Sequence, residues 1–320
     1  MNREKNDAPR REKEERKQKN TQKIGYNTYG GSEMEGQLFN GGAAFDSDLA
    51  LERRRASTYV EGVDYKRDVC FGGVWERIKV SSEAGERSIG RPMGLYDTLT
   101  LPHLDGIMPD DVEDAKDEIA RELCRMCDLC DISPERILVV GLGNRDLTPD
   151  AIGPCAALEV DATMHIKRSD PELFETLGCS EICVLCPDVT ANSGINTTDV
   201  VKGVVKEIRP TVIFAIDSLA SRSSERLGNT VQVSNTGVIP GTGVGHGSEG
   251  INEETLGVPV IAIGIPTVIS SEAFSREIGN GASRYGKQYF LSPKGINTIV
   301  KNGAKIIGGG INQAFGVCYF

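Results

Sequence analysis

The sequence predicts an α/β fold: a doubly wound, mostly parallel sheet with helices on both faces, plus a small β-rich subregion near the N-terminus. Apolar runs at residues 137–140 and 212–216 are typical of strands that are buried on both faces. Segments whose apolar residues recur at helical spacing alternate with these runs. The 320 residues, of which 39% are hydrophobic, are enough to bury a sizeable core.

The N-terminal segment differs in composition from the rest of the chain. Residues 1–46 are polar, and the stretch from Arg3 to Lys23 is dense in both signs of charge. Such a segment buries too little apolar surface to offset the entropy of ordering, so we expect a disordered tail or pro-segment. We expect a single α/β domain over residues 47–320. Within it, residues 47–105 form the β-rich subregion, because short apolar runs alternate with turns there.

The remaining elements follow from periodicity and capping. A helix is expected from Pro109 to about Cys130, because acidic residues in its first turn suit the helix dipole and its apolar residues form one stripe. Asn196 is placed to cap another helix that runs to Ile208. The sequence also predicts strands over residues 137–140, 182–185, 212–216, 230–233 and 258–263, and helices over about 150–166 and 293–314.

Composition argues against several classes of partner. The formal net charge of −10 provides no basic field that would hold nucleic acid. No apolar run reaches the roughly 20 residues needed to span a bilayer. The N-terminus has no apolar segment that could act as a signal peptide. The nine cysteines are therefore expected to be reduced thiols in a cytoplasmic protein.

Two aspartates, Asp150 and Asp217, follow predicted strands of this sheet. Ligands and chemistry gather outside the carboxyl ends of the strands in an open α/β sheet. Two carboxyl groups that meet there share a proton, because like charges at close range do not both ionise cheaply. The pair therefore indicates general acid/base catalysis. The alternatives are that Asp150 only caps a helix and that Arg222 or Arg226 neutralises Asp217.

Two glycine-rich segments accompany the aspartates. Gly141, Gly143 and Asn144 form a tight turn after a strand, but the third glycine of a dinucleotide fingerprint is missing. The longer run, residues 237–250, contains Gly241 and Gly243 and has no phosphate-binding lysine after them. It is either a mobile loop or, together with the two aspartates, a substrate-binding loop.

The cysteines raise the question of a metal site. Cys124, Cys127 and Cys130 are spaced along one predicted helix, and Cys183 and Cys186 form a second pair. Zinc or an iron–sulfur cluster is one interpretation. Helical spacing spreads the first three thiols around the helix, however, which favours small buried hydrophobes. We therefore predict no metal and no cofactor.

Several long segments share their residues with a known family. These segments are Ser47–Glu52, Ile137–Asn144, Thr148–Pro154, Thr198–Gly203, Ala215–Arg222, Gly257–Thr267, Tyr289–Lys294 and Gly310–Ala314. They resemble the germination proteases of spore-forming bacteria. That family is assigned to the aspartic endopeptidases and has an α/β fold like that of the hydrogenase-maturation peptidases.

The resemblance implies a function and a set of site residues. It implies a homotetrameric endopeptidase of the forespore and spore core that begins the degradation of small acid-soluble spore proteins, and composition already argues against direct binding of nucleic acid or membrane. It also implies a zymogen that trims itself, and we place the cut between Asp46 and Ser47. The catalytic aspartates would be Asp150 and Asp217. The predicted substrate-binding and supporting residues are Gly141, Gly143, Asn144, Thr148, Arg222, Gly241 and Gly243.

Three other functions stay open at this point. A metal-dependent peptidase of the hydrogenase-maturation type would respond to a chelator. A non-catalytic sporulation protein would keep the fold and bind a partner, although the presence of both aspartates argues against lost activity. A nucleotide-binding α/β protein would be stabilised against heat by its nucleotide.

Overall fold

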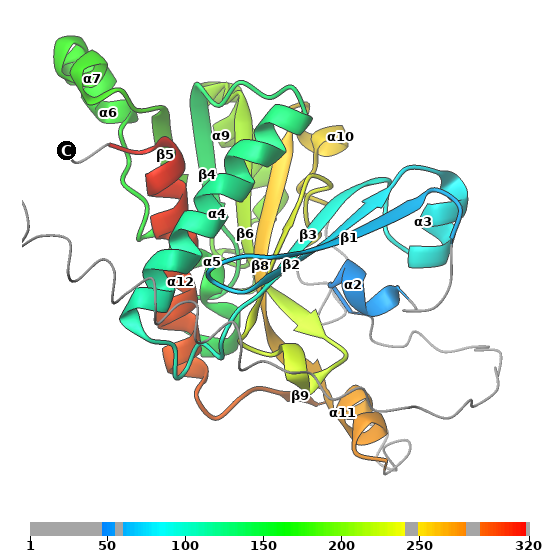
Figure 1. Ribbon diagram of the computed structural model, residues 1–320. Coiled ribbons are helices and arrows are strands. Elements are labelled where there is room, and N and C mark those ends of the chain that lie inside the picture. The colour runs from blue at the N-terminus through cyan, green and yellow to red at the C-terminus, as the bar shows by residue number, and fades with distance from the viewer. Residues whose placement is uncertain (1–46, 55–59, 241–248, 280–288, 318–320) are drawn as a thin grey trace, which may run out of the picture. The chain divides into compact units, whose positions relative to one another are not determined.

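The computed structural model describes residues 47–54, 60–240, 249–279 and 289–317 (Figure 1). Within these residues, nine strands form one sheet in the order β1-β2-β3-β7-β8-β6-β4-β5, with β9 paired to β8. The strands are β1 (Val63–Val69), β2 (Val74–Val80), β3 (Gly94–Thr100), β4 (Arg136–Gly141), β5 (Glu181–Leu185), β6 (Val212–Ser221), β7 (Thr230–Ser234), β8 (Val260–Ser270) and β9 (Phe290–Leu291). The helices are α2 (Ala50–Arg53), α3 (Glu83–Ile89), α4 (Pro109–Leu129), η1 (Thr148–Asp150), α5 (Ile152–Ala157), α6 (Met164–Ser169), α7 (Pro171–Leu177), α8 (Thr190–Ser193), α9 (Thr197–Ile208), η2 (Ser224–Arg226), α10 (Glu253–Leu256), α11 (Ser271–Glu277) and α12 (Ile296–Phe315).

The α/β class is confirmed, and the sheet has a parallel part and an antiparallel part. Strands β5, β4, β6 and β8 pair in parallel. Strands β1, β2, β3 and β7 pair antiparallel, and β7 then joins β8. The predicted parallel arrangement therefore holds for β5, β4, β6 and β8, whereas β7 and β9 pair antiparallel with β8, so the sheet as a whole is mixed. The reason is that the β-rich subregion extends the same sheet, since β3 pairs with β7.

Helices cover both faces of the parallel part, as predicted. Ile137 and Val139 of β4 lie in the buried cluster that includes residues of α4, α5 and α12. Leu138 and Val140 point the other way and pack in a second cluster with Val201 of α9. This alternation follows from the two-residue period of a strand, and burial on both faces explains why β4 is apolar throughout.

The single helix predicted over residues 150–166 is wrong. The chain forms η1, α5 and α6 there, and it leaves the helical path between α5 and α6. In that gap the Asp161 amide donates to Asn312 Oδ1 at 2.9 Å, and the Thr163 amide donates to the Ile182 carbonyl at 2.9 Å. Because α12 and β5 satisfy these backbone groups, the segment does not need to continue as a helix.

Strand β6 is longer than predicted, and this changes the position of Asp217. The strand continues to Ser221 because β8 pairs with it as far as Ile269. Asp217 therefore lies inside β6 and not at its end. Its neighbour β4 stops at Gly141, opposite Ile216. Asp217 therefore lies level with the carboxyl end of β4, although its own strand β6 continues to Ser221.

Among the described residues, no helix combines the length and the apolar composition that crossing a bilayer requires.

Candidate active site

The two aspartates come together where β4 ends beside β6. The Leu142 amide still donates to the Ile216 carbonyl at 2.8 Å, so the chain leaves β4 along the edge of β6. It then turns through a loop into η1, whose last residue is Asp150. Asp217 is the next residue of β6 after Ile216. The loop after β4 thus places Asp150 near the side chain of Asp217 on the neighbouring strand β6.

Asp217 is a buried acid. It is 7% exposed, and its Oδ1 accepts a hydrogen bond from the Ser218 amide at 2.8 Å. Burial raises the pKa of Asp217 well above its usual range, and the nearby charge of Asp150 raises it further. The Ser218 amide opposes this shift, whereas the charge of Asp48 adds to it. Asp150 and Asp48 are both acidic, so Asp217 keeps its proton at a pH where an exposed aspartate would have lost it.

Asp150 is half-buried, and its protonated form is favoured less strongly than that of Asp217. Its Oδ2 accepts a hydrogen bond from the Asn144 amide at 2.7 Å. Burial raises the pKa of Asp150 above its usual value, and the Asn144 amide pulls it back. Asp217, whose pKa is raised well above the usual value by burial and by the charge of Asp150, therefore holds its proton more firmly than Asp150.

Glycines shape the turn between β4 and Asp150. Gly143 has a φ of 109°, and a Cβ atom there would lie 2.1 Å from the Asp150 carbonyl oxygen. A Cβ on Gly141 would lie 2.5 Å from the Gly153 carbonyl oxygen. Both predicted supporting glycines therefore allow the backbone to approach the Asp150 segment closely.

An amino-terminal strap, residues Ser47–Glu52, lies along β6 and β7 beside the aspartates. The Asp48 amide donates to the Ala220 carbonyl at 2.9 Å, and the Ala220 amide donates to Asp48 Oδ2 at 2.9 Å. Gln232 of β7 accepts from the Ala50 amide through Oε1 and donates to the Asp48 carbonyl through Nε2. These paired bonds fix the strap against the strand that carries Asp217.

The far end of the strap is fixed by Glu52. Its carboxylate accepts from the Arg222 amide at 2.7 Å, the Ser223 amide at 3.1 Å and the Ser221 hydroxyl at 2.5 Å. Arg222, a predicted supporting residue, thus contacts the strap through its backbone. Arg226 is the other arginine considered as a partner for Asp217. Its Nη2 lies 3.9 Å from Oε2 of Glu76, with which it forms an ion pair.

The remaining predicted site residues fall into two groups. Thr148 begins η1, and its carbonyl accepts from the Ala151 amide at 3.1 Å. Asp46, Gly241 and Gly243 lie outside the described residues. Ser47, on the other side of the predicted cut, is fully buried at the start of the strap.

Sequence reasoning missed three polar residues next to the aspartates. Thr267 of β8 donates to the Pro149 carbonyl at 2.6 Å, and Ser218 Oγ accepts from the Ile152 amide at 3.4 Å. Asp48 of the strap is the third. For Thr267 the available signal was a hydroxyl inside an otherwise apolar strand, which must find a partner when it is buried.

The eight cysteines that the structure describes are distributed over several elements. Cys127 faces the core from α4, and burial raises the pKa of its thiol to about 12. Cys124 is exposed on the same helix, whereas Cys183 lies on β5 and packs against the other core cluster. Across the described ranges, no group of three or more His, Cys, Asp and Glu side chains could hold a metal ion.

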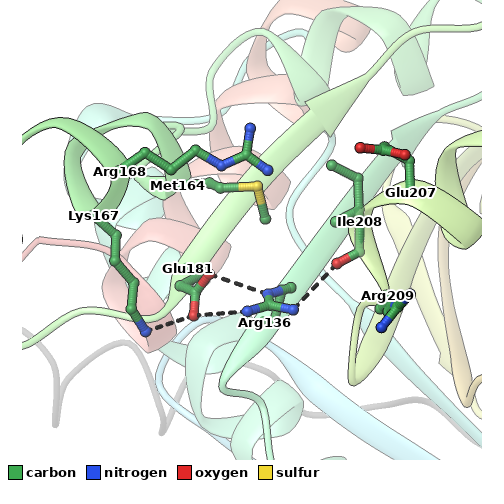
Figure 2. A pocket seen from close by; sticks show the side chains of 8 residues that line it. All are labelled: Arg136, Met164, Lys167, Arg168, Glu181, Glu207, Ile208 and Arg209. Carbon is green, nitrogen blue, oxygen red and sulfur yellow. Dashed lines mark hydrogen bonds and ion pairs between the residues drawn. The ribbon is translucent and has the colours of Figure 1, made fainter.

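Two cavities lie at the opposite end of the parallel strands. Their volumes are about 390 Å³ and 490 Å³, and Lys167 and Glu181 line both. Figure 2 shows Glu181 between Arg136 and Lys167 in the first cavity, with ion pairs of 3.0 Å and 2.6 Å. Arg136 and Glu181 are the first residues of β4 and β5, so these cavities are separate from the two aspartates at the carboxyl edge.

Comparison with known proteins decides the family. The family model described as germination protease matches residues 45–279, a range that includes both aspartates. The chain belongs to the germination protease family. The germination protease of Caldanaerobacter subterraneus subsp. tengcongensis is 35% identical over 306 residues, which cover 84% of this chain and 93% of that protein. The germination protease of Clostridium perfringens is 34% identical over 318 residues, which cover 84% and 94%.

Membership in the germination protease family makes the chain a peptidase, and therefore a hydrolase, connected with spore germination. Among solved structures, the [NiFe] hydrogenase maturation protease HycI from Thermococcus kodakarensis overlaps 58% of this chain and 99% of its own. That overlap has 14% identity and a TM-score of 0.33. The α/β assignment of this chain therefore rests on its own strand pairings.

Proposed function

We propose that the chain is an aspartic-type endopeptidase in which Asp150 and Asp217 form the general acid/base pair. The observation that carries this proposal is the burial of Asp217, which is 7% exposed and lies in the field of Asp150. Two acids in this arrangement titrate as a pair and hold one proton between them over an intermediate pH range. One acid is then ready to donate a proton while the other is ready to accept one.

The unequal environments assign the roles. Asp150, as the carboxylate, takes a proton from a water molecule, and the water oxygen attacks the carbon of the scissile peptide bond. Asp217, the more buried acid, donates its proton to the carbonyl oxygen. The resulting diol collapses when the proton on Asp150 moves to the amide nitrogen and the C–N bond breaks. A proton then returns from the diol to Asp217, so both acids regain their starting states.

The strap supports self-processing of a zymogen. It holds Ser47 and Asp48 close to Asp217, so the fold keeps this part of the chain at the site. We propose that the chain cuts itself close to the Asp46–Ser47 bond and releases the charged tail. A mature N-terminus that mass spectrometry places well inside the folded body would contradict this proposal.

The substrates, assembly and location follow from the family resemblance. We propose small acid-soluble spore proteins as substrates, a homotetramer as the working form, and the forespore and spore core as the location. Digestion of purified small acid-soluble spore proteins tests the substrate class, and analytical ultracentrifugation tests the assembly. A stable monomer with full activity would remove the tetramer from the proposal.

One experiment tests the catalytic proposal against its main alternative. The purified full-length chain is held at mildly acidic pH, with and without a chelator, beside an Asp217→Asn variant, and masses are followed. Loss of the tail in the parent regardless of chelator, but not in the variant, supports the aspartic pair. Loss that stops with chelator indicates a metal site instead. If neither the tail nor added spore proteins are cut under any condition, the catalytic proposal fails.

The pKa shifts predict how activity depends on pH. Asp217 must be protonated to act, and its pKa is raised, so the active form persists above the pH at which an exposed aspartate ionises. Activity is then lost as pH rises through the pKa of Asp217. On the acid side, activity falls as Asp150 takes up a proton. We expect a bell-shaped profile for tail loss and for substrate cleavage. A rate that climbs steadily into the alkaline range would contradict this assignment.

A further inference from the structure

We propose that Thr267 is a positioning residue that holds Asp150 in its catalytic place. This inference rests on the proposed function, because it assigns Thr267 a role in the same reaction. The segment Gly257–Thr267 resembles the family, and the contact of its last residue with the Asp150 segment gives Thr267 a role in the site.

The contact is direct and buried. Thr267 lies in β8 and is fully buried. Its Oγ1 donates to the carbonyl of Pro149, the residue before Asp150, at 2.6 Å. The Thr267 carbonyl in turn accepts a hydrogen bond from Ser292 Oγ at 2.9 Å. The segment that carries Asp150 is therefore tied to the sheet by a side chain of a central strand.

Asp150 needs such a tie because its own element is short. The 3₁₀ helix η1 spans only Thr148–Asp150, and helices of this type have weak internal hydrogen bonds. Two residues after Asp150, the Ile152 amide donates to Ser218 Oγ of β6 at 3.4 Å. Side chains of β8 and β6 thus fix the backbone just before and just after Asp150. Of the two contacts, the one made by Thr267 is the shorter.

Removal of the Thr267 hydroxyl leaves the Pro149 carbonyl without this donor. Valine has nearly the same shape and suits a strand, so Thr267→Val should fold while η1 loses its tie. A misplacement of about 1 Å at a catalytic group costs on the order of 100-fold in rate. We expect kcat on a small acid-soluble spore protein to fall roughly 10- to 100-fold with KM changed by less than about twofold. Thr267→Ser keeps the hydroxyl and should restore most of kcat.

Thr163 provides a matched control at the other end of the sheet. It is 1% exposed, and its Oγ1 donates to the Ser180 carbonyl at 2.5 Å. Thr163→Val therefore removes a buried hydroxyl–carbonyl bond at the other end of the sheet from the aspartates, and also the bond that Oγ1 accepts from the Ile182 amide at 2.8 Å, so its structural cost is at least as large. We expect it to lower the melting temperature while kcat stays within about twofold of the parent. A comparable loss of kcat in both valine variants would mean that Thr267 acts only through stability.

A second readout does not depend on activity. The Asn144 amide donates to Asp150 Oδ2 at 2.7 Å, so its exchange with deuterium reports where the Asp150 carboxylate stands. In Thr267→Val we expect this amide to exchange at least about tenfold faster, with no change in Thr163→Val. An unchanged Asn144 amide in Thr267→Val overturns the positioning role. If the amide responds but the parent cleaves nothing, the tie to Asp150 is real and the proposed function is the part that fails.

Discussion

Asp217→Asn is expected to abolish cleavage while the protein stays folded. Asparagine keeps the shape of the side chain and can still accept a hydrogen bond from the Ser218 amide. It cannot donate a carboxylic proton to the scissile carbonyl, so we expect loss of at least about 1,000-fold in rate. Mass spectrometry of the tail and digestion of spore proteins measure this loss.

The stability of this variant adds a second expectation with a defined sign. The pKa of Asp217 is raised in the folded state, so its contribution to stability is full at low pH and is lost as pH rises through that pKa. Asparagine does not ionise, so the variant should lose less stability than the parent between acidic and neutral pH. Asp199→Asn, a change at an exposed aspartate in the first turn of α9, is the control and should keep parental activity. A variant of Asp217 that cuts at the parental rate would sink the acid/base assignment.

Gly143→Ala is expected to impair both stability and activity. The φ of 109° is strained for alanine, and the added Cβ would lie 2.1 Å from the Asp150 carbonyl oxygen and 3.1 Å from its Oδ1. Backbone strain of this kind costs about 1–3 kcal/mol, and relief of the contact adds to it. We expect the free energy of unfolding to fall by about 2–4 kcal/mol. Because relief of the contact moves Asp150, we expect a rate loss of roughly 100-fold or more. Urea unfolding and cleavage assays measure the two effects.

Gly178→Ala separates backbone strain from displacement of Asp150. Gly178 also has a positive φ, of 59°, but no atom lies within 4 Å of the added Cβ. We expect a cost of about 1 kcal/mol and parental activity for this variant. If Gly143→Ala behaved in the same way, the close approach at Asp150 would have no functional importance.

The sequence was sufficient to predict the elements whose environment is simple. Strand β4 is apolar because both of its faces are covered, and Asn196 caps α9 with a hydrogen bond to the Thr198 amide. Local pattern and local chemistry decide such elements. Asp217 could be selected for the same reason, because an acid directly after an apolar run is buried with that run.

The features that the sequence did not predict depend on distant partners. The break between α5 and α6 exists because Asn312 and Ile182 satisfy amides in that gap. The length of β6 depends on β8, which supplies pairing beyond Asp217. The contact of Thr267 with Pro149 joins residues that are far apart in the chain. Periodicity within one segment contains no information about such partners.

Because the β-rich strands belong to the same sheet as the parallel strands, we expect both parts to unfold together. Strand β3 pairs with β7 along Tyr96–Thr100, and β7 pairs with β8, which lies directly beside the strand of Asp217. Separation of β1–β3 from the sheet would therefore leave the backbone amides and carbonyls of β7 that pair with β3 without partners. Native-state proteolysis should find no stable fragment that keeps the aspartates but lacks β1–β3. For protein engineering, we therefore expect that a truncated form must keep β1–β3 to stay folded around the aspartates.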